Sequence, residues 1–400
     1  MNNIMYQFCP VCNNICGDNI GELRYTLTDN HPLRNFYNIV CCSRCGFVKY
    51  DTPLNQEDYN KFYEDYFYSP SYISRKIDEN EENYIINIIE NISSYTNKQN
   101  KIFDIGCGNG LLLKKLKELG SNSLYGIDLS ESCVELLKKG GINAEQGSVL
   151  NIPFDEKADV IILSHVLEHV LDLKSALKCL YDKLSDDGIV YVEVPDAYRY
   201  DEFEDVSPLR YFYLQHIVHF DKFHLTHLFE NNGFLKIDSG YSTRVEGDLK
   251  MPCVWCIFKK INMGKINISD FTLAFEIKSW FDEHNKVNSL DNNDILKNLV
   301  DSKKNVYIWG LGIHMNMMLS MSPLKDCNIK YYIDNNERTQ KETINSQKIY
   351  STDKLKEATK DDVIVIGAPT HFKEMYNYLK EIKFKGQIIK CGFGNVEEIS

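Results

Sequence analysis

The 400-residue sequence lacks the features of a membrane or exported protein. It has no apolar run near the roughly 18 residues that a membrane-spanning helix needs, and its first residues do not form the charged, apolar and small-residue pattern of a signal peptide. Basic residues are also too few, since the net charge is -12, for a broad surface that binds the phosphate backbone of nucleic acid. We expect a cytoplasmic protein that binds neither membranes nor nucleic acid.

Cysteine, in contrast, is abundant, and the chain is long. Four hundred residues are more than one hydrophobic core usually organises, so two or three domains are expected. Hydrophobic residues make up 43% of the chain, which suffices for a large core. Thirteen cysteines in a long chain without an export signal indicate reduced thiols, some of them metal ligands, rather than disulfides.

Two C-x-x-C pairs, CPVC at 9–12 and CSRC at 42–45, have the layout of a zinc ribbon. Four thiolates complete a tetrahedral shell and leave no position for a substrate, so such a site is structural. The predicted zinc ligands are Cys9, Cys12, Cys42 and Cys45. Cys16 and Cys41 stand beside the pairs, and spacing makes them the second choice. A nucleic-acid-binding finger is the alternative, but the acidic, tyrosine-rich residues that follow lack a basic recognition helix.

From about residue 80 to 260, strand-like and helix-like segments alternate. The expected strands include KIFDIG, SLYGIDLS, ADVIILS and GIVYVEVP, and helical segments such as LLLKKLKEL separate them. This order predicts a mostly parallel sheet with helices on both faces. A second alternating unit begins at NVYIWGLG. We therefore expect an α/β protein with a zinc-binding domain (1–70), a central Rossmann-like domain (71–260) and a small C-terminal Rossmann-like domain (261–400).

The first strand-to-helix turn of the central domain is FDIGCGNG, residues 103–110. Its glycines, Gly106, Gly108 and Gly110, permit positive φ and a close approach of the backbone to a ligand. Asp128 ends the next strand, where a carboxylate can accept both hydroxyls of a ribose. The spacing suits several nucleoside cofactors, but a G-x-G-x-G turn with Asp104 before it differs from the dinucleotide fingerprint G-x-G-x-x-G.

The run SHVLEH, residues 164–169, has two interpretations. His165, Glu168 and His169 form H-x-x-E-H, which on a helix places two imidazoles around a zinc ion, as in inverted zinc peptidases. Alternatively, the preceding VIIL ends a buried strand, and His165 begins a loop at the floor of a cleft. The cofactor signature that comes before this run favours the second interpretation.

Taken together, these motifs resemble those of class I S-adenosylmethionine-dependent methyltransferases. FDIGCGNG, GIDLS, GSVLNIPF and ADVIILSHVLEHVLD stand in the order of that family. The resemblance implies a cleft for the methionine part at Asp104 and the glycines, a ribose contact at Asp128 and an adenine border at 147–149. The implied cofactor-binding residues are Asp104, Gly106, Gly108, Gly110, Asp128, Ser148, Val149, Ser164 and His165.

Nearly the whole chain is similar to the zinc-containing sugar C-methyltransferases of deoxysugar biosynthesis. Those enzymes take a nucleotide-linked keto sugar, remove a proton from the carbon next to the ketone, and methylate that carbon. Their substrate motif Y-x-Y-x-S is matched at Tyr66 and Tyr68, but Pro70 departs from it. The resemblance thus implies a small-molecule acceptor, while the sequence leaves the sugar and the oligomeric state open.

The catalytic run of that family, Y-x-E-H, is matched by Tyr213, Gln215 and His216. The resemblance implies that His216 takes the proton and that Tyr213 or His169 steadies the resulting oxygen anion. Gln215 can orient His216 but lacks the charge of the family's glutamate, so O- or N-methylation of a sugar or another polar metabolite stays open. A cofactor-binding assembly protein without activity is a third alternative, which the intact glycine turn argues against.

Other histidines and cysteines are assigned to packing. His219, His224 and His227 are expected to be packing or surface residues on a helix that follows His216. Cys253 and Cys256 lie in the strand-like stretch MPCVWCIF and are expected to be core thiols.

The C-terminal unit has a glycine turn of its own. Gly310 and Gly312 follow a strand, and Asp334 comes later, which resembles a nicotinamide site. Met315 stands where the third glycine is required. The resemblance to the sugar C-methyltransferases implies a wall over the nucleotide of the substrate here rather than a second cofactor.

Overall fold

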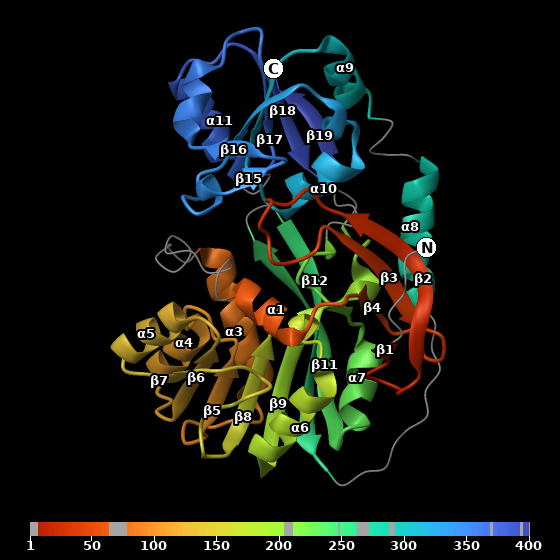
Figure 1. Cartoon of the computed structure of the whole chain (residues 1–400). Coiled ribbons are helices and arrows are strands. Elements are labelled where there is room, and N and C mark those ends of the chain that lie inside the picture. Colours follow the sequence, from red (N-terminus) through yellow and green to blue (C-terminus); the bar gives the residue numbers. More distant parts are fainter. Residues whose placement is uncertain are drawn as a thin grey trace.

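The computed structural model describes residues 7–63, 78–203, 211–246, 249–261, 272–287, 293–368, 371–392 and 395–399. These residues form three sheets, one in each part of the chain (Figure 1). Among them, no helix is both long and apolar enough to cross a membrane.

The central sheet has the order β11-β12-β9-β8-β5-β6-β7. The strands are β5 (Ile102–Ile105), β6 (Leu124–Asp128), β7 (Asn143–Gln146), β8 (Ala158–Ser164), β9 (Leu184–Pro195), β11 (Phe234–Glu246) and β12 (Leu249–Lys260). Strands β5 to β9 pair in parallel, whereas β11 and β12 form an antiparallel hairpin on β9. The expected Rossmann-like α/β architecture is confirmed. Apolar strands such as β5, buried along its length, form its core.

Five helices accompany this sheet: α3 (Glu79–Ser93), α4 (Leu111–Glu118), α5 (Glu131–Lys139), α6 (Leu173–Lys183) and α7 (Lys222–Glu230). Each of α3, α5, α6 and α7 begins with a side-chain cap, for example Asp78, whose carboxylate accepts from the N–H of Glu81. Helix α4 has Gly110 at its N-cap, which offers no side-chain cap, and the N–H of Leu111 donates to Oδ1 of Asn109 instead.

The N-terminal sheet is antiparallel and has the order β1-β2-β3-β4-β10. Its strands are β1 (Gln7–Phe8), β2 (Ile15–Arg24), β3 (Phe36–Cys42), β4 (Val48–Asp51) and β10 (Val218–His219), and helix α1 (Gln56–Phe62) follows β4. His219 was expected on a helix, and this expectation is wrong: His219 lies in β10 and pairs with Val48. The two-residue strand is too short to leave a period in the sequence, so only the long-range pairing reveals it.

The C-terminal sheet has the order β15-β16-β14-β13-β17-β18-β19. Its strands are β13 (Val306–Trp309), β14 (Ile329–Ile333), β15 (Thr343–Ile344), β16 (Gln347–Tyr350), β17 (Val363–Ile366), β18 (Gln387–Gly392) and β19 (Asn395–Ile399). The helices of this part are α9 (Asp294–Ser302), α10 (Ile313–Met321) and α11 (Phe372–Glu381), whereas α8 (Thr272–Val287) packs against β2 of the N-terminal sheet. The five inner strands are parallel, which confirms a second α/β unit.

The N-terminal sheet connects the two α/β units (Figure 1). On one side, the hydroxyl of Tyr25 donates to the carbonyl of Phe212, and the hydroxyl of Tyr50 donates to that of Tyr213. On the other side, the N–H of Thr26 donates to the carbonyl of Asn316 in α10. The bonds of Tyr25 and Tyr50 therefore hold the segment around residue 213 against the N-terminal part of the chain.

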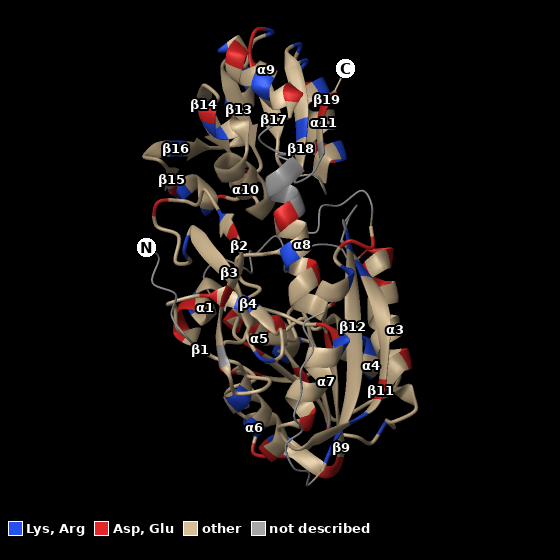
Figure 2. Ribbon diagram, turned by 90° about the vertical axis from the view of Figure 1, so that its right-hand side faces the viewer, with Lys and Arg blue, Asp and Glu red and all other residues tan. Residues whose placement is uncertain are grey.

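Acidic and basic residues are interspersed along the elements of both α/β units (Figure 2).

Candidate functional site

A cleft of about 390 Å³ opens at the carboxyl ends of β5, β6 and β8. The sheet extends from β5 through β6 and β7 in one direction and through β8 and β9 in the other, so the strand order reverses between β5 and β8. Open α/β sheets bind ligands at such a point. The glycine turn and residues of the segments 164–170 and 213–216 line the cleft.

The glycine turn between β5 and α4 has a left-handed backbone. Gly106, Gly108 and Gly110 have φ values of 72°, 51° and 74°. A Cβ atom on Gly110 would lie 2.1 Å from Cδ2 of Leu137. The N–H of Gly108 donates to Oδ2 of Asp128 over 2.8 Å. The acid at the end of β6 thus fixes the turn in addition to facing the cleft.

Replacement of Gly110 by alanine is expected to lower the free energy of unfolding by about 2–5 kcal/mol, since a left-handed residue with a side chain costs about 1–2 kcal/mol and overpacking about 1–3 kcal/mol. Gly312→Ala is the matched control, because Gly312 precedes α10 with φ of -66° and none of the described atoms lies within 4 Å of its added Cβ. Urea unfolding measures both variants. Equal stability of the two would contradict the geometry of the turn.

Asp104, two residues before the first glycine, lies at the bottom of the cleft and is 4% exposed. Burial, and secondly the nearby carboxylate of Asp128, raise the pKa of Asp104 to about 8. A cationic ligand group would favour the ionised form of this carboxyl, because its positive charge offsets the cost of burial and the repulsion by Asp128.

Three histidines and a glutamate line the same cleft as the glycine turn. Nδ1 of His165 is 3.1 Å from Oε1 of Glu168, and Nε2 of His169 is 3.8 Å from the same oxygen. The rings of His169 and His216 are in contact, with centroids 4.9 Å apart. His165 follows β8 with φ of 55°, and the turn after it is a 3-10 helix of only Leu167–His169. The two histidines of the H-x-x-E-H run therefore share no α-helical face, as the loop interpretation predicts.

His216 is 6% exposed and lines the cleft. Burial, followed by the neighbouring His169, holds the pKa of His216 well below its usual value, so the imidazole is neutral at pH 7. Its Nδ1 has no hydrogen-bond partner among the residues that the structure describes. The ring of Tyr213 lies 4.7 Å from that of His216, between centroids. A neutral imidazole that lines a cleft can accept a proton from a bound ligand.

Gln215 was expected to orient His216, but its hydrogen bond to a histidine is with His169. Nδ1 of His169 donates to the backbone carbonyl of Gln215 over 2.9 Å. This bond fixes the position of the His169 ring, whereas the expected bond is one from the side chain of Gln215 to His216. The side chain of Gln215 does line the cleft.

The family comparison matches this region. Residues 77–238 fit the family model described as "Methyltransferase domain". This segment is a methyltransferase domain. A second family model, described as "C2185-like, N-terminal", matches residues 302–389 in the C-terminal unit.

Relatives of the methyltransferase domain include the mitochondrial ubiquinone biosynthesis O-methyltransferase of Bos taurus, 34% identical over 104 residues, which are 23% of this chain and 28% of the relative. The tRNA U34 carboxymethyltransferase of Campylobacter hominis is 36% identical over 100 residues, which are 23% of this chain and 35% of the relative. The magnesium protoporphyrin IX methyltransferase of Synechocystis PCC 6803 matches in structure with 14% identity and a TM-score of 0.40, over 51% of this chain and 99% of that one. This chain spans less than half the length of the curated relatives it matches.

The remaining cofactor residues predicted from the sequence also lie at the cleft of the methyltransferase domain. Ser148, Val149 and Ser164 line it, and the hydroxyl of Ser164 lies 2.6 Å from that of Tyr84. Tyr84 comes from α3 and was missed, because a tyrosine in an acidic helix gives no sequence signal. Tyr66 and Tyr68 lie outside the described residues. Tyr63, which precedes them, contacts the His169 ring with centroids 5.1 Å apart and lines the cleft.

Glu168 and Arg244 are further residues of the cleft that were not among the predicted site residues. Glu168 is 1% exposed, and burial raises its pKa. Arg244 projects from β11 and has its guanidinium 5.4 Å from the ring centre of Tyr84. In the sequence, Glu168 stood out only as part of the H-x-x-E-H run, one interpretation of which was a zinc site on a helix.

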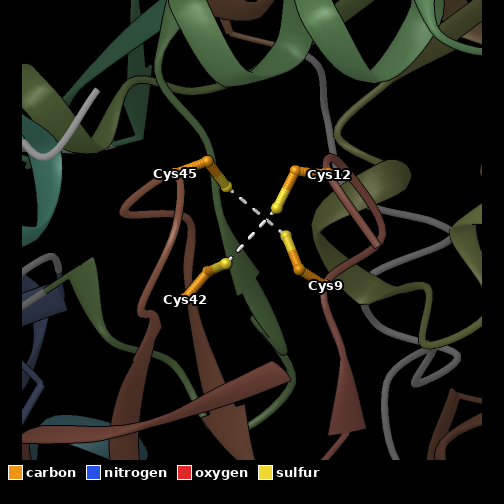
Figure 3. Close-up of side chains that lie close together, drawn as sticks. All are labelled: Cys9, Cys12, Cys42 and Cys45. Carbon is orange, nitrogen blue, oxygen red and sulfur yellow. Dashed lines mark hydrogen bonds between the residues drawn. The ribbon is translucent and has the colours of Figure 1, made fainter. Parts of the chain in front are cut away.

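The four cysteines of the C-x-x-C pairs converge at one point (Figure 3). Their sulfurs all lie within 4.8 Å of one another; Sγ of Cys9 is 3.5 Å from Cys45, and Sγ of Cys12 is 3.4 Å from Cys42. Two thiolates of a tetrahedral zinc site are separated by about 3.8 Å when each bond is about 2.3 Å. The cysteines therefore fit a zinc ion in both number and spacing.

The glycine turn of the C-terminal unit is closed by its own side chains. Oδ2 of Asp334 accepts from the N–H of Leu311 over 2.8 Å, much as Asp128 does in the methyltransferase domain. Met315 is fully buried, and its Cε would lie 2.4 Å from a Cβ added to Gly367. The methionine at the third glycine position thus fills the space beside the turn.

Proposed function

We propose that this chain is an S-adenosylmethionine-dependent methyltransferase that methylates the carbon next to the ketone of a nucleotide-linked sugar. One observation carries the proposal: the glycine turn, two buried aspartates and the neutral His216 all line a single cleft. A site for a nucleoside cofactor and a proton acceptor thereby share the same space.

When bound, S-adenosylmethionine supplies an activated methyl group on a sulfonium. The proposed roles of the chain are to bind and orient it: Asp104 receives the ammonium of the methionine part, Asp128 the ribose hydroxyls, and Ser148 and Val149 border the adenine. Ser164 and His165, which also line the cleft, are proposed to contact the cofactor. Positioning of this kind accounts for much of the rate that a transfer to carbon requires.

On the acceptor side, His216 takes the proton from carbon, and Tyr213 or His169 donates to the oxygen that becomes negative. Because Nδ1–H of His169 donates to the carbonyl of Gln215, Nε2 of a neutral His169 carries no proton, so His169 makes this contact only in its protonated form, whereas Tyr213 has a hydroxyl to donate. Tyr66 and Tyr68 are proposed to contact the sugar. Since Gln215 adds no charge, Glu168 is the nearest carboxylate for a protonated histidine, with ligating atoms of Glu168, His169 and His216 within 4.8 Å.

The second candidate is methylation of an oxygen or nitrogen of a sugar or another polar metabolite. The glutamine at 215 favours it, because a hydroxyl or amine is a stronger acid or nucleophile than a carbon and asks less of the base. We also propose that Cys9, Cys12, Cys42 and Cys45 hold a structural zinc ion.

Proton exchange tests the role in carbon chemistry separately from methyl transfer. Nucleotide-linked 4-keto sugars are incubated in D₂O with the protein and S-adenosylhomocysteine, which has no methyl group to give. The proposal expects deuterium at the carbon next to the ketone, at a rate well above that in buffer. Exchange at the buffer rate for every sugar of the panel would contradict methylation of carbon and favour an oxygen or nitrogen acceptor.

Affinity for S-adenosylmethionine is expected to rise with pH. The pKa of Asp104 is raised to about 8 in the free protein, so its carboxyl is protonated below that pH and must lose the proton to pair with an ammonium. The affinity therefore rises by up to about tenfold per pH unit below pH 8, and stops rising near the pKa of the ligand's own amino group at about 8. Calorimetry at pH 6, 7 and 8 measures it; Asp104→Asn should bind weakly at each pH, and a flat wild-type profile would contradict the role of Asp104.

A further inference from the structure

We propose that His165, Glu193 and Cys253 bind a second zinc ion beneath the floor of the cleft. The three residues come from neighbouring positions of the central sheet: His165 follows β8, Glu193 lies in β9, and Cys253 lies in β12. One nitrogen, oxygen or sulfur atom from each lies within 4.8 Å of the other two. The sheet thus brings an imidazole, a carboxylate and a thiol to one point from residues far apart in the chain.

The distance between the sulfur and the imidazole fits a shared metal ion. Sγ of Cys253 is 3.7 Å from Nε2 of His165. In a tetrahedral zinc site with bonds of about 2.3 Å to sulfur and about 2.0–2.1 Å to nitrogen, these two atoms are separated by about 3.5–3.6 Å. Zinc accepts sulfur, nitrogen and oxygen ligands together, whereas calcium and magnesium require oxygen.

Outer contacts prepare two of the three ligands. Nδ1 of His165 faces the buried carboxylate of Glu168 at 3.1 Å, so this nitrogen carries the proton and Nε2 presents its lone pair toward Cys253. A carboxylate behind a ligating histidine is the usual companion of a zinc site. The hydroxyl of Tyr191 donates to Oε2 of Glu193 over 2.5 Å, which leaves Oε1 for the metal.

The free oxygen of Glu193 is the second observation that indicates a ligand. Glu193 is 1% exposed, and within the part of the chain that the structure describes its Oε1 has no hydrogen-bond partner. A buried carboxylate oxygen without a partner is unfavourable. Neither Glu193 nor Cys253 lines the cleft, so a ligand bound there does not supply the missing contact. A zinc ion with one carboxylate and one thiolate is neutral overall, which suits a buried position.

The backbone at His165 supports the same arrangement. Its φ of 55° is left-handed, a conformation that costs a residue with a side chain about 1–2 kcal/mol. Such strain persists where the surroundings fix the side chain, and it is concentrated at functional sites. The other cluster of this kind, Glu168, His169 and His216, belongs to the acceptor side already described.

Metal content of the purified full-length protein tests the proposal. After dialysis against metal-free buffer, the wild type should contain two zinc ions per chain by mass spectrometry, and Cys253→Ser and Glu193→Gln one each. Cys256→Ser is the matched control, because Cys256 is a fully buried thiol of the same strand outside the cluster, and it should retain both ions. Equal zinc in Cys253→Ser, Cys256→Ser and the wild type would overturn the proposal.

Cadmium-113 NMR of the unmutated protein keeps the proposal testable if a variant fails to fold. Two resonances are expected, one from a site with four sulfurs and one from a site with mixed sulfur, nitrogen and oxygen. A spectrum with the four-sulfur resonance alone would overturn the second site. Neither measurement requires S-adenosylmethionine or an acceptor, so its result is independent of the proposed methyl transfer.

Discussion

Replacement of His216 by alanine is expected to lower kcat for methyl transfer by about 10²–10⁴-fold, the usual contribution of a general base. His216 is buried, neutral and at the cleft, with Nδ1 unpaired among the described residues. Its loss removes the group that takes the proton. Affinity for S-adenosylmethionine should stay nearly the same, because the residues proposed to bind it are the glycine turn and the two aspartates, which the variant leaves unchanged.

The matched control for this variant is His227→Ala. His227 lies on α7, outside the cleft, and its Nδ1 donates to the carbonyl of Phe223. Single-turnover kinetics and calorimetry of the same preparations separate transfer from binding. Normal turnover of His216→Ala would show that this histidine is not the base. Loss of both turnover and cofactor binding would show that His216 maintains the structure of the site instead.

Removal of the zinc proposed at the N-terminal cysteines is expected to have the largest effect on stability. Structural zinc contributes about 10 kcal/mol or more in small domains, so Cys42→Ser should lower the thermal midpoint by about 10 °C or more. Loss of the zinc ion should also disturb residues 213–219, which include residues of the cleft, because hydrogen bonds join this part of the chain to the cysteine region. The carbonyl of Cys45 accepts from Nε2 of His224 over 2.7 Å, and the N–H of Tyr50 donates to the carbonyl of Ile217 over 2.8 Å.

Cys41→Ser is the control for the zinc-site variant, because Cys41 is a buried neighbour of Cys42 outside the four-sulfur group. Hydrogen exchange is the informative readout. Cys42→Ser should expose the amides of β4 and of residues 213–219, while those of β5 and β6 keep their protection. Equal midpoints and equal exchange in the two variants would contradict a structural metal at this position.

The cofactor side of the site could be predicted from sequence because it is local. The glycine turn is contiguous, and Asp128 ends the strand that follows it, so their proximity depends only on the parallel crossover. The two C-x-x-C pairs have the same property: each pair is a tight turn, and β3 continues directly into the second one. Periodicity and turn chemistry suffice for such features.

The acceptor side depends on contacts between distant parts of the chain. Tyr84 of α3 and Arg244 of β11 reach the cleft from elements whose sequence patterns record only helix and strand. The role of Gln215 was predicted from its side chain, whereas its backbone carbonyl makes the bond to His169. Cys253 was assigned to the core by its apolar neighbours. It is buried as expected, but only the order β12-β9-β8 places it beside His165.

The most direct test of the account is an NMR assay with S-adenosylmethionine labelled with carbon-13 in the methyl group. The purified protein is mixed with a panel of nucleotide-linked 4-keto sugars and their reduced counterparts. If His216 is the base for methylation of carbon, a labelled methyl is expected on the carbon next to the ketone. It should form only from the keto sugars and be absent with His216→Ala. A labelled methyl on oxygen or nitrogen, formed equally from the reduced sugars, would contradict carbon methylation while keeping the cofactor site.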